Sequence, residues 1–178
     1  MKKIKRWDEL IKRVGRDKPL KMVEVGVWQG KMCKNLLASM PLLDWSGVDP
    51  WLAPEQGSSY ALSGAQIAAQ RQESFEAAFK KAAEIINSYP GRAKAYRMTS
   101  QEAARLFPDN SLDIVFIDGD HSYEGTKKDI LLWAPKVKKG GLLCGHDYKN
   151  PPAEVHKAVD ELIKNIELGE DHTWFCLA

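Results

Sequence analysis

Short apolar runs rich in β-branched residues alternate with longer amphipathic segments, and this alternation constrains the fold more than any other feature of the chain. The clearest run is LDIVFI at 112–117, and another begins at Met22 and leads into glycines. Further strands are expected at 45–48, 93–98, 142–144 and 173–177, and helices at 31–40, 66–88, 101–106, 123–133 and 152–166. Strands that alternate with helices predict a doubly wound α/β fold, in which helices cover both faces of a mainly parallel sheet.

The length of 178 residues fits one domain that spans 1–178. Within residues 1–17 apolar side chains recur at helical spacing between lysines and arginines, which predicts an N-terminal amphipathic helix. Residues 52–64 are rich in Pro, Gly, Ser and Ala and have no periodicity. Because loops of this length are usually functional or disordered, we expect 52–64 to be a candidate lid.

Charge and cysteine content exclude several classes of protein. The formal net charge of +2 is too small to indicate a nucleic-acid or membrane partner. No apolar segment approaches the roughly 20 residues that cross a bilayer, and the basic first residues are not followed by the apolar stretch of a secretory signal. The three cysteines, Cys33, Cys144 and Cys176, are too scattered to predict a zinc site or a disulfide framework. We expect a cytoplasmic protein with reduced thiols.

The first strand runs into the turn Glu24-Val25-Gly26-Val27-Trp28-Gln29-Gly30. Glycines at this spacing let the backbone turn tightly and approach a ligand, and the start of the next helix presents its amides there. A dinucleotide-binding loop has the pattern GxGxxG, and Trp28 stands at its second glycine, where an indole would block a pyrophosphate. The loop favours a ligand that has amino and carboxylate groups without phosphates, although a plain turn between strand and helix has the same glycines.

The next strand ends in Asp49, followed by Pro50 and Trp51. A carboxylate at this place can accept hydrogen bonds from both hydroxyls of a ribose. Trp51 offers an apolar wall for an adenine ring. An aspartate before a proline is also a common turn residue, but together with the glycine loop it favours a nucleoside ligand.

Two polar motifs follow later strands: Asp118-Gly119-Asp120-His121-Ser122-Tyr123, and, after Gly140-Gly141, the motif Gly145-His146-Asp147-Tyr148. Together with Glu24-x-Gly26-x-x-x-Gly30 and Asp49, they resemble class I S-adenosylmethionine-dependent methyltransferases. Within that class they are similar to a small subfamily related to macrocin-type and catechol-type O-methyltransferases. The resemblance covers about residues 20–165.

The resemblance implies roles that spacing alone does not give. It places Ser100 and Gln101, with Thr99, near the adenine of the cofactor. It assigns Glu24, Gly26, Gly30 and Asp49 to cofactor binding, and from their places beside these residues we add Trp28 and Trp51 to the predicted cofactor site. Family members end their sheet with a pair of antiparallel strands, whereas only 173–177 is evident here, so a short C-terminal edge, or one completed by another chain, is expected.

Asp118, His146 and Asp147 are expected to meet, because adjacent parallel strands end at the same edge of a sheet. Two carboxylates and an imidazole at one place repel unless a positive charge joins them. A divalent cation is one candidate, and oxygen-rich ligation suits Mg²⁺ or Mn²⁺. The related O-methyltransferases hold a metal with acids or amides at the matching strand ends, and His146 departs from that pattern. The alternative is that Asp118 caps the next helix or meets the cofactor, and that His146 hydrogen-bonds its loop.

His121 lies in the loop after Asp118 and is the predicted catalytic base. A neutral imidazole there could take the proton of a hydroxyl group as its oxygen attacks the methyl sulfonium. Related sugar O-methyltransferases are proposed to use the matching histidine in this way. A histidine that merely hydrogen-bonds its loop is the alternative interpretation.

The sequence therefore predicts an S-adenosylmethionine-dependent methyltransferase, with metal-assisted O-methylation of a small hydroxylated acceptor as the leading mechanism. The alternatives are a metal-independent methyltransferase on another acceptor and a cofactor-binding module without catalysis. A nicotinamide dehydrogenase is disfavoured by Trp28. A small-molecule acceptor is the expected partner, and a homo-oligomer is compatible with the sequence.

Overall fold

The computed structural model describes residues 3–178, and Met1 and Lys2 lie outside the described part. Its helices are α1 (Arg6–Val14), α2 (Lys31–Ser39), α3 (Ser59–Leu62), α4 (Gln72–Asn87), α5 (Ser100–Ala104), α6 (Tyr123–Trp133), the 3₁₀ turn Ala134–Lys136 and α7 (Val155–Leu162). Its strands are β1 (Leu20–Val25), β2 (Leu43–Val48), β3 (Ala93–Tyr96), β4 (Leu112–Ile117), β5 (Val137–Gly145), β6 (Glu167–Leu168) and β7 (Trp174–Leu177). No helix within 3–178 is both long and apolar enough to span a membrane.

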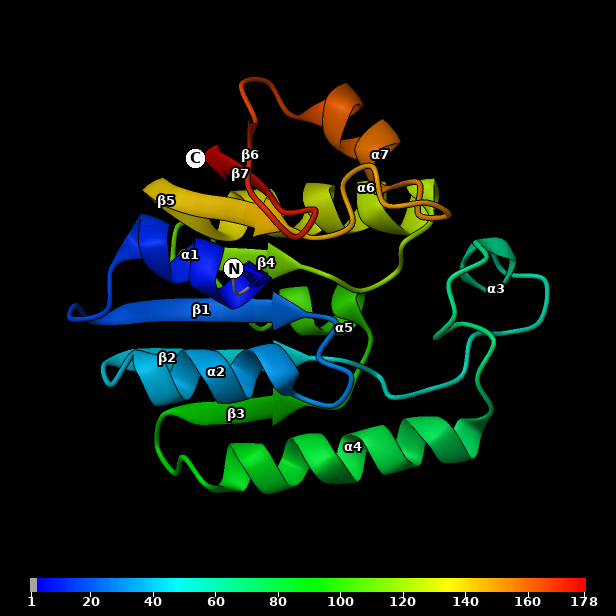
Figure 1. Cartoon of the computed structure of the whole chain (residues 1–178), viewed down its shortest axis with the longest axis horizontal. Coiled ribbons are helices and arrows are strands. Elements are labelled where there is room, and N and C mark those ends of the chain that lie inside the picture. Colours follow the sequence, from blue (N-terminus) through cyan, green and yellow to red (C-terminus); the bar gives the residue numbers. More distant parts are fainter. Residues whose placement is uncertain (1–2) are drawn as a thin grey trace.

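The strands form one sheet in the order β3-β2-β1-β4-β5-β7-β6, in which β1 to β5 run parallel and β7 is antiparallel to both neighbours (Figure 1). The predicted doubly wound α/β fold is confirmed. The short antiparallel edge is confirmed as well, since β6 has two residues and pairs only with Trp174 and Phe175 of β7.

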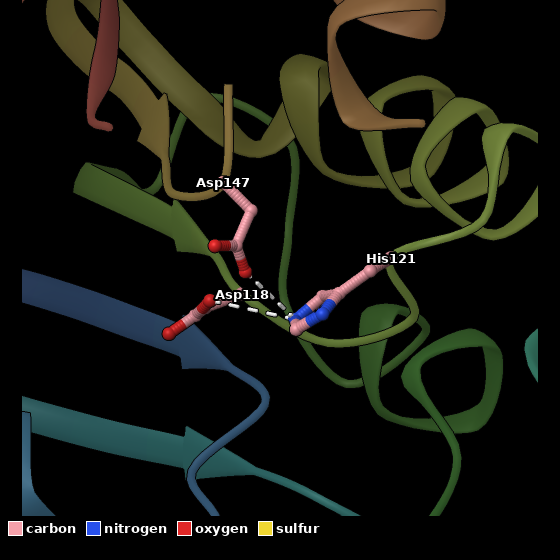
Figure 2. Close-up of side chains that lie close together, drawn as sticks. All are labelled: Asp118, His121 and Asp147. Atoms are coloured by element: carbon pink, nitrogen blue, oxygen red, sulfur yellow. Dashed lines mark ion pairs between the residues drawn. The ribbon is translucent and has the colours of Figure 1, made fainter. Parts of the chain in front are cut away.

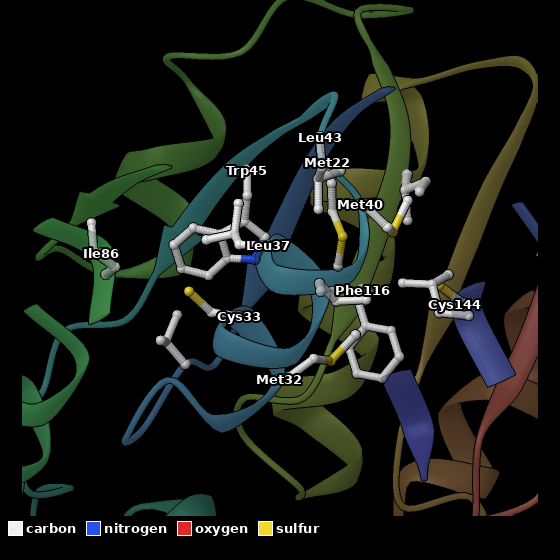
Figure 3. Packing of buried hydrophobic residues seen from close by; sticks show 14 of the residues in the cluster. Met22, Met32, Cys33, Leu37, Met40, Leu43, Trp45, Ile86, Phe116 and Cys144 are labelled. Carbon is white, nitrogen blue, oxygen red and sulfur yellow. The ribbon is translucent and has the colours of Figure 1, made fainter. Parts of the chain in front are cut away.

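Alternate residues of each strand enter two separate cores, one on each face of the sheet. Met22, Trp45 and Phe116 join the side chains of α2 in the first core, which Figure 3 shows, and α1 and α4 add to it. Val23 and Val115 point the other way, into a second core shared with α5, α6 and α7. The helices therefore cover both faces, and the carboxyl ends of the parallel strands stay free for a site.

The largest differences from the sequence prediction lie between 52 and 88. The stretch 52–64 contains α3, whose first turn is capped by the Ser58 hydroxyl, which accepts a hydrogen bond from the Ala61 amide at 3.2 Å. The long helix begins at Gln72 instead of 66. The Gln72 side chain is the reason, because it accepts a hydrogen bond from Ala53 N and donates one to Trp51 O, which fixes the chain there.

Four functional positions follow the strand ends in register. Val25 of β1 pairs with Val48 of β2 and with Ile117 of β4, and Ile117 pairs with Gly145 of β5. The next residues along these strands are Gly26, Asp49, Asp118 and His146. The order of strands reverses between β1 and β4, so these residues lie at the topological switch point, where doubly wound folds bind their ligands.

Candidate functional site

Two cavities lie side by side at the carboxyl ends of the strands. The first has a volume of about 300 Å³ and is bounded by the ends of β1, β2 and β4, by the start of α5 and by part of α6. The second, of about 400 Å³, lies between the glycine loop, α1 and the ends of β4 and β5. Both cavities are lined by Gly26, Trp28, Ile67, Asp118 and His121. The second cavity thus opens beside the first at the end of β4.

The glycine loop is held against β4 by close backbone packing. A side chain at Gly26 would place its Cβ 2.1 Å from the carbonyl oxygen of Asp118, so only glycine fits. Trp28 adopts a left-handed backbone conformation with φ of 51°, between Gly26 at 86° and Gly30 at 72°. The loop keeps a glycine-like backbone at Trp28, which is uncommon for a bulky residue. Its indole packs edge-on against Phe75 and forms a wall of both cavities.

The other predicted residues of this loop lie elsewhere. Glu24 borders the second cavity and accepts a hydrogen bond from the Trp45 indole at 2.9 Å. Burial outweighs this hydrogen bond and raises the pKa of Glu24 to about 8. Gly30 starts α2 as its N-cap and packs near Ala82 of α4, apart from the lining of both cavities.

Asp49 lines the first cavity, and its carboxylate also organises the loops around it. Oδ2 accepts hydrogen bonds from the amides of Val27 and Trp28 at 3.0 and 2.9 Å, and Oδ1 accepts one from Trp51 at 2.7 Å. Burial raises the pKa of Asp49, and these amides oppose the shift. The bond from Trp51 is the turn role that the sequence offered as the alternative, whereas the two bonds to the glycine loop were not predicted.

The placement of Trp51 corrects the prediction that it forms the wall for the adenine. Its side chain is 0% exposed, packs against Phe79 at 4.9 Å between ring centroids, and donates a hydrogen bond to Trp28 O at 2.8 Å. A bulky ring in this position gains more from the apolar core than from a polar cleft. Pro50 and Leu52, its neighbours in sequence, line the cavity instead.

Ser100 and Gln101, which are predicted to lie near the adenine, line the first cavity together with Thr99. The Ser100 hydroxyl contacts Asp129 Oδ1 of α6 and accepts a hydrogen bond from the Trp133 indole at 2.8 Å. Asp129 is buried and lines the same cavity. Sequence reasoning missed Asp129, because an aspartate that follows two lysines on a helix is typical of an exposed face.

Asp118, Asp147 and two imidazoles form a compact cluster where the cavities meet. His121 Nε2 lies 3.6 Å from Asp118 Oδ1 and 3.3 Å from Asp147 Oδ2, and Figure 2 shows the three side chains turned toward one another. One ligand atom from each of Asp118, His121 and Asp147 lies within 4.8 Å of the other two. The structure therefore brings His121 into the converging set with the two acids.

His146 lies on the other side of Asp147. Its Nδ1 is 3.0 Å from Asp147 Oδ1 and 3.5 Å from Asp118 Oδ1. Neither ring nitrogen makes a hydrogen bond within residues 3–178, although both are buried. Orphaned imidazole nitrogens next to two carboxylates fit a ligand role, so the assignment of His146 to a metal site stays a prediction.

Neighbouring charges shift the pKa values of the carboxylates and imidazoles in this cluster. Burial would raise the pKa of Asp118, but the Arg6 guanidinium and the imidazoles hold it well below its usual range. Burial would lower the pKa of His146, yet Asp118 and Asp147 raise it to about 9. The same carboxylates raise the pKa of His121. Both imidazoles are therefore biased toward their protonated forms when no other cation is near.

Arg6 of α1 provides a positive charge that sequence reasoning missed. Its Nη1 contacts Asp118 Oδ2, and its backbone amide donates to Asp171 Oδ2 at 3.2 Å. Lys3 and Lys5 lie 3.8 Å from Asp171 as well. Arg6 and Asp118 are 112 positions apart, so no local pattern could pair them. A divalent cation was the predicted source of positive charge at this cluster, and Arg6 supplies part of that charge from the chain itself.

The chain is similar to known methyltransferases in sequence and fold. Residues 23–148 match the family model Methyltransf_24, described as a methyltransferase domain. The uncharacterized protein R132 of Acanthamoeba polyphaga mimivirus is 26% identical over 158 residues, which make up 85% of this chain. The chain spans 62% of the length of R132.

Two solved structures share the fold at low identity. The calicheamicin methyltransferase CalS11 is 15% identical with a TM-score of 0.63, over 96% of this chain and 75% of CalS11. The O-methyltransferase NovP is 19% identical with a TM-score of 0.60, over 89% of this chain and 72% of NovP. The family match covers the strand ends that build the site, from the glycine loop to Asp147. The chain belongs to the Methyltransf_24 family, whose model is described as a methyltransferase domain.

Proposed function

We propose that this domain, 1–178, transfers the methyl group of S-adenosylmethionine to an oxygen atom of a small hydroxylated acceptor. The observation that carries this proposal is that Asp118 and His121 border both cavities. The adenosine end of the cofactor would occupy the first cavity, and the acceptor the second. A methyl group at their junction would then lie beside the acid–imidazole cluster.

The residues of the first cavity fit the cofactor. Gly26 lines this cavity, and Asp49 Oδ1 keeps lone-pair capacity after its bond to the Trp51 amide. Ser100 and Gln101 stand at the far wall. When bound, the cofactor supplies an electrophilic methyl carbon on its sulfonium, so the protein has to align the acceptor oxygen and receive its proton.

Methyl transfer to oxygen forms the O–CH₃ bond as the S–CH₃ bond breaks, and the hydroxyl proton must leave. The acids and imidazoles beside the second cavity provide acceptors for that proton. NovP is described as an O-methyltransferase, and CalS11 as a TDP-rhamnose 3′-O-methyltransferase. These descriptions support oxygen as the acceptor atom.

The donor set of Asp118, His121 and Asp147 fits a divalent cation such as Mg²⁺ or Mn²⁺. The buried Nε2 of His146, which has no hydrogen bond within residues 3–178, supports the same assignment. A cation at this place would lower the pKa of the acceptor hydroxyl and fix its position. In this arrangement His121 is a ligand, which revises its predicted role as the base.

Arg6 favours a second candidate, methyl transfer without a metal. Its guanidinium contact with Asp118 Oδ2 supplies positive charge where a cation would otherwise be needed. His121 would then receive the proton itself, which requires its neutral form, whereas the neighbouring carboxylates favour the protonated one. Activity that survives exhaustive chelation would favour this candidate over the metal-assisted one.

The proposal predicts that S-adenosylhomocysteine binds in the micromolar range and that NAD⁺ does not. The reason is the Trp28 side chain, which fills the place where a dinucleotide loop leaves room for its pyrophosphate. Isothermal titration calorimetry measures both affinities. Binding of NAD⁺ without S-adenosylhomocysteine would contradict the proposal.

Asp49→Ala is expected to weaken S-adenosylhomocysteine binding by about 1–3 kcal/mol, since the ribose hydroxyls lose their charged acceptor. The variant also frees the amides of Val27, Trp28 and Trp51, so its thermal midpoint should fall as well. Calorimetry and thermal unfolding measure the two effects. Asp44→Asn, an exposed change on β2, is the control. An unchanged affinity in Asp49→Ala would exclude Asp49 from the cofactor site.

The 52–64 stretch is expected to be mobile without ligand and ordered by the cofactor. Leu52 and Tyr60 line the first cavity, and the Tyr60 ring lies 6.3 Å from that of His121. Apart from these contacts the stretch buries little, so few interactions hold it closed. Hydrogen exchange at 52–64 should slow when S-adenosylhomocysteine is added. Equal exchange rates in both states would contradict a lid.

A further inference from the structure

The carboxylate of Asp129 is buried beside the first cavity, and neither methyl transfer nor the acid–imidazole cluster uses it. It lies on α6, its side chain belongs to a residue that is 5% exposed, and it lines the cavity. A buried carboxylate is costly unless hydrogen-bond donors or a cation meet it. Its presence in this wall therefore needs an explanation.

One oxygen of Asp129 is held and the other is free. Trp133 Nε1 donates to the Ser100 hydroxyl at 2.8 Å, and Ser100 in turn contacts Oδ1, so this chain of hydrogen bonds fixes the carboxylate. Oδ2 has no donor in the part of the chain that the structure describes. A Cβ built on Gly119 would lie 3.5 Å from Oδ2, so this oxygen faces the bare turn that follows β4 and bounds the cavity.

The surroundings of Asp129 raise the pKa of its carboxyl group toward neutral pH, so its protonation state can change in that range. Burial raises its pKa to about 7, the Ser100 hydrogen bond opposes the shift, Asp120 adds to it and Lys128 reduces it. An additional donor from a ligand would favour the ionised form. The free oxygen is thus an unsatisfied acceptor at the wall that also carries Ser100 and Gln101.

We propose that Asp129 recognises the exocyclic amine of the cofactor's adenine through Oδ2, and so makes the site select a 6-aminopurine over a 6-oxopurine. This inference rests on the proposed assignment of the first cavity to the adenosine end of the cofactor. The amine donates to the ionised carboxylate, whereas the 6-oxo group of hypoxanthine would bring a second acceptor against it. Sites built around a specific donor reject analogues that lack it strongly, because their own polar group is left unpaired.

The test compares S-adenosylhomocysteine with S-inosylhomocysteine, its deaminated analogue, by isothermal titration calorimetry on the full chain. At pH 8 the adenosyl ligand should bind the wild-type protein at least about 100-fold more tightly. Lowering the pH through 7 protonates Asp129, which weakens binding of the amine and lets the carboxyl group donate to the 6-oxo group. The affinity ratio should therefore fall at least about tenfold between pH 8 and pH 6.

The ratio, unlike each affinity alone, is insensitive to groups that face the shared part of both ligands. His121 and His146 lie at the cluster where the methionine end would sit, so their titration should change both affinities alike. The pH dependence of the ratio needs no variant. This measurement on the wild-type protein therefore tests the proposal even if a substituted protein does not fold properly.

Asp129→Asn supplies the second arm of the test. An amide can present either its oxygen to an amine or its NH₂ group to an oxo group, so the ratio should shrink to within about tenfold and lose its pH dependence. Asp120→Asn is the matched control, because it removes the same charge from the same cavity while its carboxylate is committed to the Ser122 amide. This control should leave the ratio at pH 8 near the wild-type value.

Equal binding of both ligands by the wild-type protein would overturn the role of Asp129 and leave the methyltransferase proposal intact. A ratio that Asp129→Asn does not change would overturn it as well. Failure of the wild-type protein to bind either ligand would contradict the cofactor assignment of the cavity, and with it this inference.

Discussion

Asp147→Asn is expected to weaken Mn²⁺ binding roughly 100-fold or more while S-adenosylhomocysteine affinity stays nearly unchanged. The variant replaces a carboxylate of the converging donor set, and even residues that only support metal ligands cost 10–100-fold when replaced. Asp147 does not line the first cavity, so the adenosine end should not sense the change. Electron paramagnetic resonance of free Mn²⁺ and calorimetry measure the two affinities.

The substitution suits the backbone, because Asp147 has a φ of 59° and asparagine tolerates this left-handed conformation. Asp171→Asn is the matched control. It has a φ of 56°, lines the same second cavity and loses the same charge, but its partners are Arg6, Lys3 and Lys5. Equal losses of Mn²⁺ affinity in both variants would contradict a ligand role for Asp147.

His121→Ala is expected to lower turnover by roughly 10²–10⁴, which is the usual contribution of a positioned proton acceptor. A loss of this size is also expected if His121 acts as a ligand of a metal ion that activates the acceptor. The effect needs an acceptor found by screening hydroxylated compounds at saturating S-adenosylmethionine. His156→Ala, on α7 and outside both cavities, is the control. A turnover within threefold of the wild-type rate would remove His121 from the reaction.

Mn²⁺ affinity of the same variant separates the two roles of His121. If His121 is a metal ligand, His121→Ala should lose most of the Mn²⁺ affinity of the wild-type protein. As a base beside a metal held by Asp118, His146 and Asp147, its loss should leave Mn²⁺ affinity unchanged and lower turnover alone. The distances of 3.6 and 3.3 Å from His121 to the two acids favour the ligand role.

The strands and the polar residues after them could be predicted from the sequence because β-branched runs and the residues that follow them are local signals. The runs at 112–117 and 142–144 could be recognised as adjacent parallel strands, and this arrangement then required Asp118, His146 and Asp147 to meet. The fold class and the positions of the acids and imidazoles were therefore predictable. It was not predictable that His121, rather than His146, would converge with Asp118 and Asp147, because this depends on the side-chain directions in the loop after β4.

The features that escaped prediction depend on tertiary contacts. Arg6 lies on a surface-like helix, and only the packing of α1 against the strand ends brings it to Asp118. Asp129 follows two lysines, a pattern typical of an exposed helix face. Trp51 was assigned to the cavity wall because it neighbours Asp49, but its ring turns into the core.

A crystal structure of the protein soaked with S-adenosylhomocysteine and Mn²⁺ tests the central claim, that cofactor and acceptor sites meet at Asp118 and His121. The account predicts adenosine density in the first cavity and an anomalous Mn²⁺ peak about 2.0–2.6 Å from ligand atoms of Asp118, His121 and Asp147. Adenosylhomocysteine in the first cavity without a peak would leave the metal-independent candidate. Adenosylhomocysteine bound away from both cavities would contradict the account.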